Sequence, residues 1–261
     1  MKMGYAFLIL FMFICSQAFC GAVFLSPEQA GRVGLKVWKN ECGGTVEGLV
    51  SWNDGEDFAS LGIGHFIWYP EGMRGPFEES FPRLVALAVS SGMELPQVLK
   101  EHKHCPWRDR TTFQKASSSV QMWQLRSFLK ETFPLQTTFL ISRMEAALPK
   151  MQEGLGDGEC GRLVSRFRGL AATAHGAYAM IDYVNFKGEG VSEKERYGGE
   201  GWGLKQVLLG MQEEIFHKDQ CLAFSESAKR VLTRRVKNSP PERKESRWLQ
   251  GWLNRCDTYR D

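Results

Sequence analysis

Apolar residues recur at steps of three and four positions along most of this chain, which is the spacing of one face of a helix. The first such segment follows Ser26, which can cap a helix, with Pro27 at the first helical position and Gln29 where a capping box requires it. Gly43-Gly44 ends the pattern, because glycine readily adopts the left-handed conformation that closes helices. The sequence therefore predicts a helix that begins at Pro27 and has Glu41 in its last turn.

The composition shifts between Thr45 and Tyr69 to Val, Trp, Phe, Ile and Gly around the triplet Asn53-Asp54-Gly55. Apolar and β-branched residues on both sides of such a triplet are typical of two strands joined by a tight turn. Gly62 and Gly64 fall in the second strand, where glycine lets the backbone bend or approach a ligand closely. We expect one small β-hairpin here, as the one clear β element of the chain.

The remaining apolar patterns predict a mainly α fold of the α+β class, helical with this single hairpin. We expect residues 21–261 to form one domain, with a candidate division into two lobes, residues 21–80 and 81–261. The expected helices are Phe81–Ser90, Leu95–His102, Ser118–Thr132, Thr137–Met151, a long Leu163–Tyr183, Trp202–Phe216, Gln220–Val236 and Lys244–Arg255.

The N-terminus has the pattern of an export signal. A positive start at Met1-Lys2 is followed by the apolar run Ala6–Cys15, and small residues at positions 18 and 20 fit cleavage before Gly21. We therefore expect residues 1–20 to be a signal peptide and the protein to be periplasmic or secreted. The apolar run is too short for a membrane span, so membrane contact is expected only through this segment. A lipoprotein acylated at Cys20 fits less well, because Phe19 stands where a small residue is expected.

Charge and cysteine content narrow the function classes further. The chain of 261 residues has 33 Lys and Arg against 30 Asp and Glu, a net charge of +3 that gives no argument for a nucleic-acid partner. After the leader, the cysteines are widely and irregularly spaced, with no Cys-x-x-Cys motif and no histidine cluster. We expect no metal and no cofactor, and we assign no disulfide pairing. These cysteines are Cys42, Cys105, Cys160, Cys221 and Cys256.

Acidic residues gather at the first helix end and in the turn that follows. The C-terminal end of a helix carries partial negative charge, which favours the protonated form of Glu41 that a general acid uses. Asp54, Glu56 and Asp57 crowd the hairpin turn, and glycoside hydrolysis usually needs two carboxyl groups. Each feature taken alone also fits a simpler interpretation, a solvated turn or a bent strand with a packed histidine.

Taken together, these residues resemble the phage-type lysozymes and the wider lysozyme-like superfamily. In that family a catalytic Glu closes the first helix, and a hairpin follows with the pattern Asp, five residues, Thr-Ile-Gly-x-Gly-His. Here Asp54 is followed by five residues and then by Ser60-Leu61-Gly62-Ile63-Gly64-His65. The resemblance implies that Glu41 is the general acid, Asp54 the second carboxyl and Ser60 the hydroxyl that positions water. It implies a structural or substrate-lining role for His65.

Two departures from the family pattern leave the identity of the second carboxyl open. Ser60 replaces the usual Thr, which preserves the hydroxyl but not the stiffness of a β-branched side chain. The segment between Glu41 and Asp54 is also longer than in the phage pattern, so the hairpin must differ in size. Glu56 therefore competes with Asp54 as the second carboxyl, because its longer side chain could reach the same groove.

A second block, from Tyr183 to Gln206, combines aromatic rings, amides and glycines between two predicted helices. Aromatic rings can stack on sugar faces, and amides can bind acetamido groups. The block resembles the far wall of a lysozyme-like cleft, and we expect Tyr183, Asn185, Lys187 and Gln206 to line it. The same residues also fit a plain loop between helices with packed aromatics and surface charges.

The resemblance implies an N-acetylmuramidase, a glycosidase that hydrolyses β-1,4 bonds in the glycan of peptidoglycan. A lytic transglycosylase on the same substrate is the nearest competing function, because it keeps the acid Glu without needing a second carboxyl. The sequence is also compatible with a lysozyme-like protein that binds glycan without cutting it, and with an unrelated helical exported protein. We expect peptidoglycan or a related amino-sugar polymer as the partner and a monomeric protein.

Overall fold

The computed structural model describes residues 25–75 and 77–260, so the expected signal peptide and Cys20 lie outside the described residues. The described part is mainly helical with two small antiparallel sheets, as the sequence predicts in outline. Its helices are α1 Pro27–Cys42, α2 Phe81–Ser90, α3 Gln97–Glu101, α4 Arg110–Lys115, α5 Val120–Glu131, α6 Phe133–Gln152, α7 Asp157–Ala171, α8 Ala174–Lys187, α9 Leu204–Gly210, α10 Glu213–Phe216, α11 Gln220–Asn238 and α12 Ser246–Asp257. No helix in this part is long and apolar enough to cross a bilayer.

Helix α1 begins and ends as its capping residues predict. The Ser26 side chain accepts from the Gln29 backbone N–H, and the Gln29 side chain accepts in return from the Ser26 N–H. Gly43 follows with φ 61°, the left-handed conformation that closes the helix. The two caps fix both ends of α1, and Glu41 therefore lies in its last turn.

The predicted two-strand hairpin is wrong in its number of strands. The first sheet has three antiparallel strands in the order β1-β2-β3, and residues 62–65 form the turn between the last two. Gly62 adopts φ 72° there, so the glycines that were expected inside a strand instead reverse the chain. A second, unpredicted sheet is formed by a short hairpin near residue 198. The strands are β1 Val50–Ser51, β2 Ala59–Leu61, β3 Phe66–Trp68, β4 Arg196–Tyr197 and β5 Glu200–Gly201.

A buried amide on α6 holds the turn between β2 and β3. The Gln136 side-chain oxygen accepts from the Ile63 backbone N–H at 2.8 Å. Its amide nitrogen donates to the Leu129 carbonyl at 2.6 Å, so the buried group is bonded at both ends. This contact joins the sheet to the helices and sets the position of His65 at the end of the turn.

The expected long helix Leu163–Tyr183 is also wrong, because α7 ends at Ala171 and α8 begins at Ala174. Thr173 is extended between them, and its hydroxyl accepts from the Gly176 N–H as an N-cap. The apolar pattern runs through this break because both helices bury one face against the same core. The segment expected as Trp202–Phe216 is likewise divided, into α9 and α10, and α4 was not predicted.

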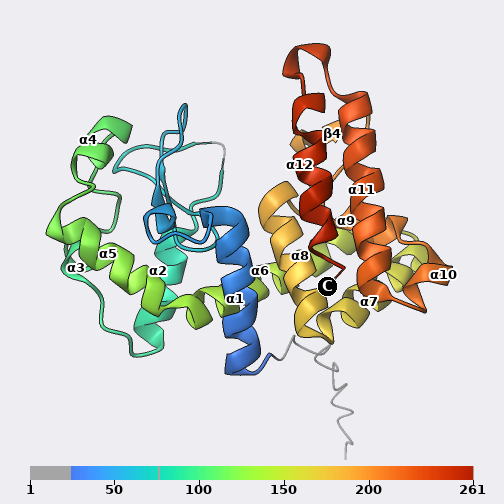
Figure 1. Ribbon diagram of the computed structural model, residues 1–261, viewed down its shortest axis with the longest axis horizontal. Helices are drawn as coiled ribbons and strands as arrows, with labels where there is room; N and C mark the ends of the chain where they lie inside the picture. Colours follow the sequence, from blue (N-terminus) through green and yellow to red (C-terminus); the bar gives the residue numbers. More distant parts are fainter. Residues whose placement is uncertain (1–24, 76, 261) are drawn as a thin grey trace, which may run out of the picture.

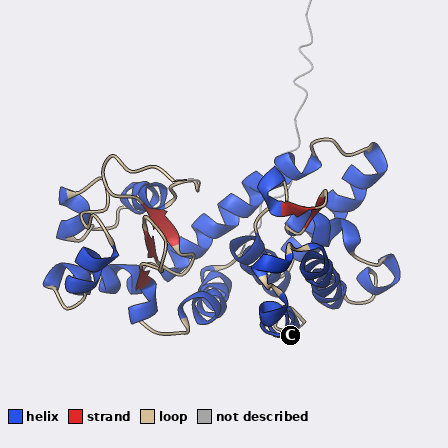
Figure 2. Ribbon diagram, turned by 90° about the horizontal axis from the view of Figure 1, so that it is seen from above, coloured by secondary structure: helices blue, strands red, loops and turns tan. Residues whose placement is uncertain are grey.

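The elements form two groups that α6 connects (Figure 1). The first sheet and α2 to α5 lie together on one side, and α7 to α12 lie on the other. Helix α1 packs against both α6 and α8, and the same arrangement appears from above, with one small sheet in each group (Figure 2). The single domain and the candidate boundary after residue 80 stay predictions, and α2 packs against β3 of the preceding sheet.

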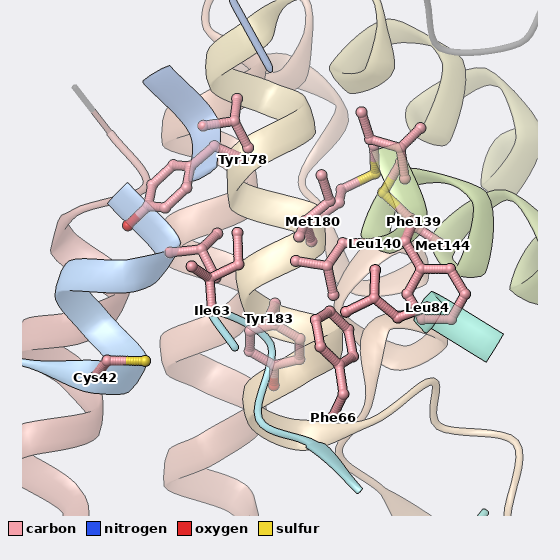
Figure 3. Packing of buried hydrophobic residues seen from close by; sticks show 14 of the residues in the cluster. Cys42, Ile63, Phe66, Leu84, Phe139, Leu140, Met144, Tyr178, Met180 and Tyr183 are labelled. Carbon is pink, nitrogen blue, oxygen red and sulfur yellow. The ribbon is translucent and has the colours of Figure 1, made fainter. Parts of the chain in front are cut away.

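The core where the sheet meets the helices is closely packed (Figure 3). Ile63 in the β2–β3 turn and Phe66 directly after it are fully buried. The Phe66 ring meets Phe139 of α6 edge-on, with centroids 5.3 Å apart. Tyr183 of α8 is buried nearby in the same cluster. Burying the turn against α6 and α8 places its polar end at the surface between the two groups.

Candidate active site

A groove of about 290 Å³ opens between the first sheet and helices α6 and α8. Its lining comes from the end of α1, the sheet with its two turns, the segment before α2, and one face each of α6 and α8. Acidic, amide, hydroxyl and aromatic side chains all contribute, which is the mixture expected where a polar ligand is held. The lining residues are Glu41, Asn53, Glu56, Phe58, Ser60, Gly64, His65, Ile67, Phe77, Glu78, Ser80, Arg143, Val184 and Asn185.

The Glu41 carboxyl, which lines this groove, is held by partners far away in sequence. Its side chain is 13% exposed, and its Oε1 accepts from Arg255 Nη2 at the end of α12. Its Oε2 lies 3.6 Å from His65 Nδ1 in the β2–β3 turn. Three separate elements therefore meet at this one carboxyl group.

Arg255 is itself fixed by a second carboxylate, the fully buried Asp182 of α8. The Asp182 oxygens accept from Arg255 Nε and Nη2 at 2.8 Å each. They also accept from the Tyr259 hydroxyl at 2.6 Å and from Asn40 Nδ2 at 3.1 Å. Burial opposes the positive charge of Arg255, but the charges of Asp182 and Glu41 outweigh burial and raise the Arg255 pKa above its ordinary range.

One guanidinium therefore faces two carboxyl groups, those of Glu41 and Asp182. Asp182 accepts four hydrogen bonds and is sealed from water. Glu41 lines the groove and stands at the negative end of α1. Glu41 is thus the member of the cluster that a molecule in the groove can reach.

The first sheet contributes Ser60 and His65, both of which line the groove. Ser60 lies on β2, paired with Ser51 on one side and Ile67 on the other. His65 has φ 46°, a left-handed conformation that costs energy in a residue other than glycine and often marks a functional position. The His65 Nε2 atom lies 3.8 Å from the Cys42 Sγ, whose pKa is raised to about 12, first by burial and then by the Glu41 charge.

The two candidates for the second carboxyl occupy different positions. Glu56 lines the groove, and its Oε2 accepts from Asn53 Nδ2 at 3.1 Å. The Asp54 side chain is 95% exposed and lies 3.5 Å from Arg110 Nη1, and Asp54 is not part of the groove lining. Of the two, Glu56 is the carboxyl that a ligand in this groove would meet.

The far wall is only partly as expected, since Asn185 lines the groove and three other candidates have partners elsewhere. The buried Tyr183 hydroxyl donates to the Trp202 carbonyl at 2.7 Å. Lys187 Nζ lies 3.4 Å from the Trp252 ring centroid, and burial lowers its pKa to about 7. The Gln206 amide bonds to backbone groups of residues 190 and 203. Tyr183 and Gln206 therefore support the loop beyond α8, and Lys187 packs against α12.

Several groove residues escaped prediction from the sequence. Arg143 on α6 faces the groove, and burial lowers its pKa although nearby carboxylates act against this. Arg255 and Asp182 were missed as well. The sequence does contain a signal for Arg143 and Asp182. Each interrupts an apolar helical run, and a buried charge in such a run needs a partner. Phe58, Phe77 and Glu78 are among the other lining residues that were not predicted.

Comparison of the chain with models of known protein families, with curated proteins and with solved structures gave no match. The grounds for a function are therefore the residues of the groove and their geometry.

Proposed function

We propose that this protein is a peptidoglycan-cleaving glycosidase, an N-acetylmuramidase with a lysozyme-like fold that cuts β-1,4 bonds of cell-wall glycan. The observation that carries the proposal is the position of Glu41, a carboxyl in the last turn of α1 that lines a polar groove and is held there by Arg255. The helical fold with a small antiparallel sheet beside this groove supports the lysozyme-like part of the proposal. Export through residues 1–20 would bring the protein to this polymer.

In the proposed reaction, Glu41 gives its proton to the glycosidic oxygen as the bond to the departing sugar breaks. Positive charge then develops on the sugar ring, and a second carboxylate stabilises it or activates the attacking water. Glu56 is the better placed candidate for that role, with Ser60 as the hydroxyl that orients the water. After proton transfer Glu41 is a carboxylate, which Arg255 stabilises.

The exposure of Asp54 favours a second candidate, a lytic transglycosylase. Such an enzyme uses the same acid but closes the sugar on itself instead of adding water, so it can do without a second carboxyl. If Glu56 plays no part in the chemistry, Glu41 alone is enough for this reaction. The substrate, the groove and the role of Arg255 would be unchanged.

Digestion of purified peptidoglycan with the purified protein tests the proposal, with the released fragments identified by mass spectrometry. We expect fragments that end in reducing N-acetylmuramic acid. Fragments that end in anhydro-muramic acid would instead indicate the transglycosylase reaction. Binding to insoluble peptidoglycan without release of any fragment would contradict both and indicate a glycan-binding protein.

A pair of substitutions separates the candidates for the second carboxyl. We expect Glu56→Gln to slow hydrolysis of peptidoglycan by about 100-fold or more, because a carboxylate acting on water typically contributes this much. Asp54→Asn, the matched change in the same turn, should leave the rate near that of the wild type, because Asp54 is exposed and paired with Arg110. The reverse result would assign the role to Asp54, and two unaffected rates would favour the transglycosylase.

A further inference from the structure

Phe77 is an aromatic residue with an unusual position, at the edge of the groove and largely in solvent. It lies in the segment between β3 and α2, its side chain lines the groove, and 58% of the residue is exposed. Single exposed apolar residues are common on protein surfaces and need no explanation alone. Phe77 differs because it lines a candidate binding groove together with Glu41.

The Phe77 ring is held in place rather than merely exposed. Phe58 meets Phe77 edge-on, with ring centroids 5.9 Å apart, and packs in the same way on Tyr69 at 5.2 Å. The Tyr69 hydroxyl donates to the Phe77 carbonyl at 3.4 Å, and the Tyr69 N–H donates to Glu79 at 2.8 Å. The row of three rings therefore holds Phe77 at the edge of the groove, and Phe77 stays more than half exposed to a ligand.

A second hollow begins on the other side of Phe77. This neighbouring cavity has a volume of about 510 Å³, and Phe77 is the residue that its lining shares with the groove. Arg74 and His104 line this cavity and offer polar groups beside the Phe77 ring. The remaining lining residues are Tyr69, Gly72, Met73, Gly75 and Glu79. A linear polymer that fills the groove and continues past Glu41 can pass over Phe77 into this space.

A sugar ring can bind at the exposed Phe77 ring, because a pyranose presents C–H groups on its faces and hydroxyl and acetamido groups around its rim. The faces pack on aromatic rings, whose electron-rich surface attracts the slightly positive C–H groups. The polar rim needs hydrogen-bond partners, which the flanking cavity supplies. We propose that Phe77 is a stacking platform for a sugar of a β-1,4-linked amino-sugar chain and leads the chain from the groove into the neighbouring cavity.

This inference rests on the proposed function in the same groove and adds a preference for long chains. The groove alone holds the sugars on either side of the bond that is cleaved, whereas Phe77 and the neighbouring cavity bind sugars further along the chain. Long glycans should therefore bind more tightly than short ones, and the difference should depend on Phe77.

Binding of chitobiose and chitohexaose, measured by isothermal titration calorimetry, tests the inference. The measurement uses the Glu41→Gln background, so that no sugar is cut during the titration. We expect Phe77→Ala to weaken chitohexaose binding about 5- to 10-fold, the size of one aromatic contact, and to weaken chitobiose binding less. Phe77→Trp keeps an aromatic face and should retain the tight binding of chitohexaose.

Trp123→Ala is the matched control, since Trp123 on α5 is an aromatic residue that is 66% exposed and lines neither hollow. It should leave both affinities unchanged. Equal chitohexaose affinities with and without the Phe77 ring, or no binding of chitohexaose by the parent, would overturn the inference. Digestion of peptidoglycan decides the proposed function separately. A protein that cuts but ignores Phe77 disproves the platform alone, and one that shows Phe77-dependent binding without cutting disproves the enzyme alone.

Discussion

Replacing Glu41 with Gln is expected to slow the release of fragments from peptidoglycan about 1,000-fold, within the range that general acid catalysis contributes. Gln has nearly the same shape, and its side-chain oxygen can still accept from Arg255 Nη2. It has no acidic proton to give to the glycosidic oxygen, however. The substitution therefore removes the chemistry proposed for this position and preserves most of its contacts. Initial rates of fragment release measure the effect.

Glu47→Gln provides the control, because Glu47 is an exposed residue shortly after α1 and the chemical change is the same. We expect this variant to release fragments at the wild-type rate. A thermal unfolding curve for Glu41→Gln should show a folded protein, which separates lost chemistry from lost structure. An active Glu41→Gln variant, at half the wild-type rate or more, would exclude Glu41 as the acid.

Replacing Asp182 with Asn is expected to lower the free energy of unfolding by about 3 kcal/mol or more, the usual cost of removing one partner of a buried ion pair. Each Asp182 oxygen accepts two hydrogen bonds, and all four come from donors on Asn40, Arg255 and Tyr259. Asn offers one oxygen and one NH₂ group, so at least one Arg255 N–H would face another donor. Arg255 would also stay buried with Glu41 as its remaining charged partner.

Urea denaturation followed by circular dichroism measures this loss, with Asp54→Asn as the matched control. Asp54 is almost fully exposed, so the same change there should alter the free energy of unfolding by no more than about 0.5 kcal/mol. Equal stabilities of the two variants would show that the buried cluster contributes nothing to folding. That result would also remove the argument that Asp182 holds Arg255 against Glu41.

Local sequence signals predict α1 and α2 well, for different reasons. Ser26 and Gly43 cap α1, whereas α2 has no side-chain cap and is predicted to the residue, Phe81–Ser90, from its apolar positions. The break at Thr173 was missed because the apolar positions continue through it and a threonine is compatible with a helix interior. The third strand was missed because glycine fits both a bent strand and a turn. The contact of the Ile63 N–H with Gln136, which distinguishes the two, joins residues that are distant in sequence.

The same distinction applies to the candidate site: residues close together in sequence could be predicted, and partners distant in sequence could not. Glu41, Glu56, Ser60 and His65 lie close together in the sequence, and they line one groove because α1 and the sheet are neighbours. The partners that hold the acid, Asp182 and Arg255, come from α8 and α12. No spacing rule connects them to Glu41, so only the folded chain brings these partners to the site.

The contact between Glu41 and Arg255 joins residues that are 214 positions apart. A ribosome synthesises α1, the first sheet and α6 well before it reaches α12, so a growing chain contains the acid and most of the groove without the arginine. Contacts of such high sequence separation also form late in folding, because closing a long loop costs entropy. The proposed site is therefore complete only after α12 has been made and has docked. A chain that ends before α12 lacks the group that holds its acid.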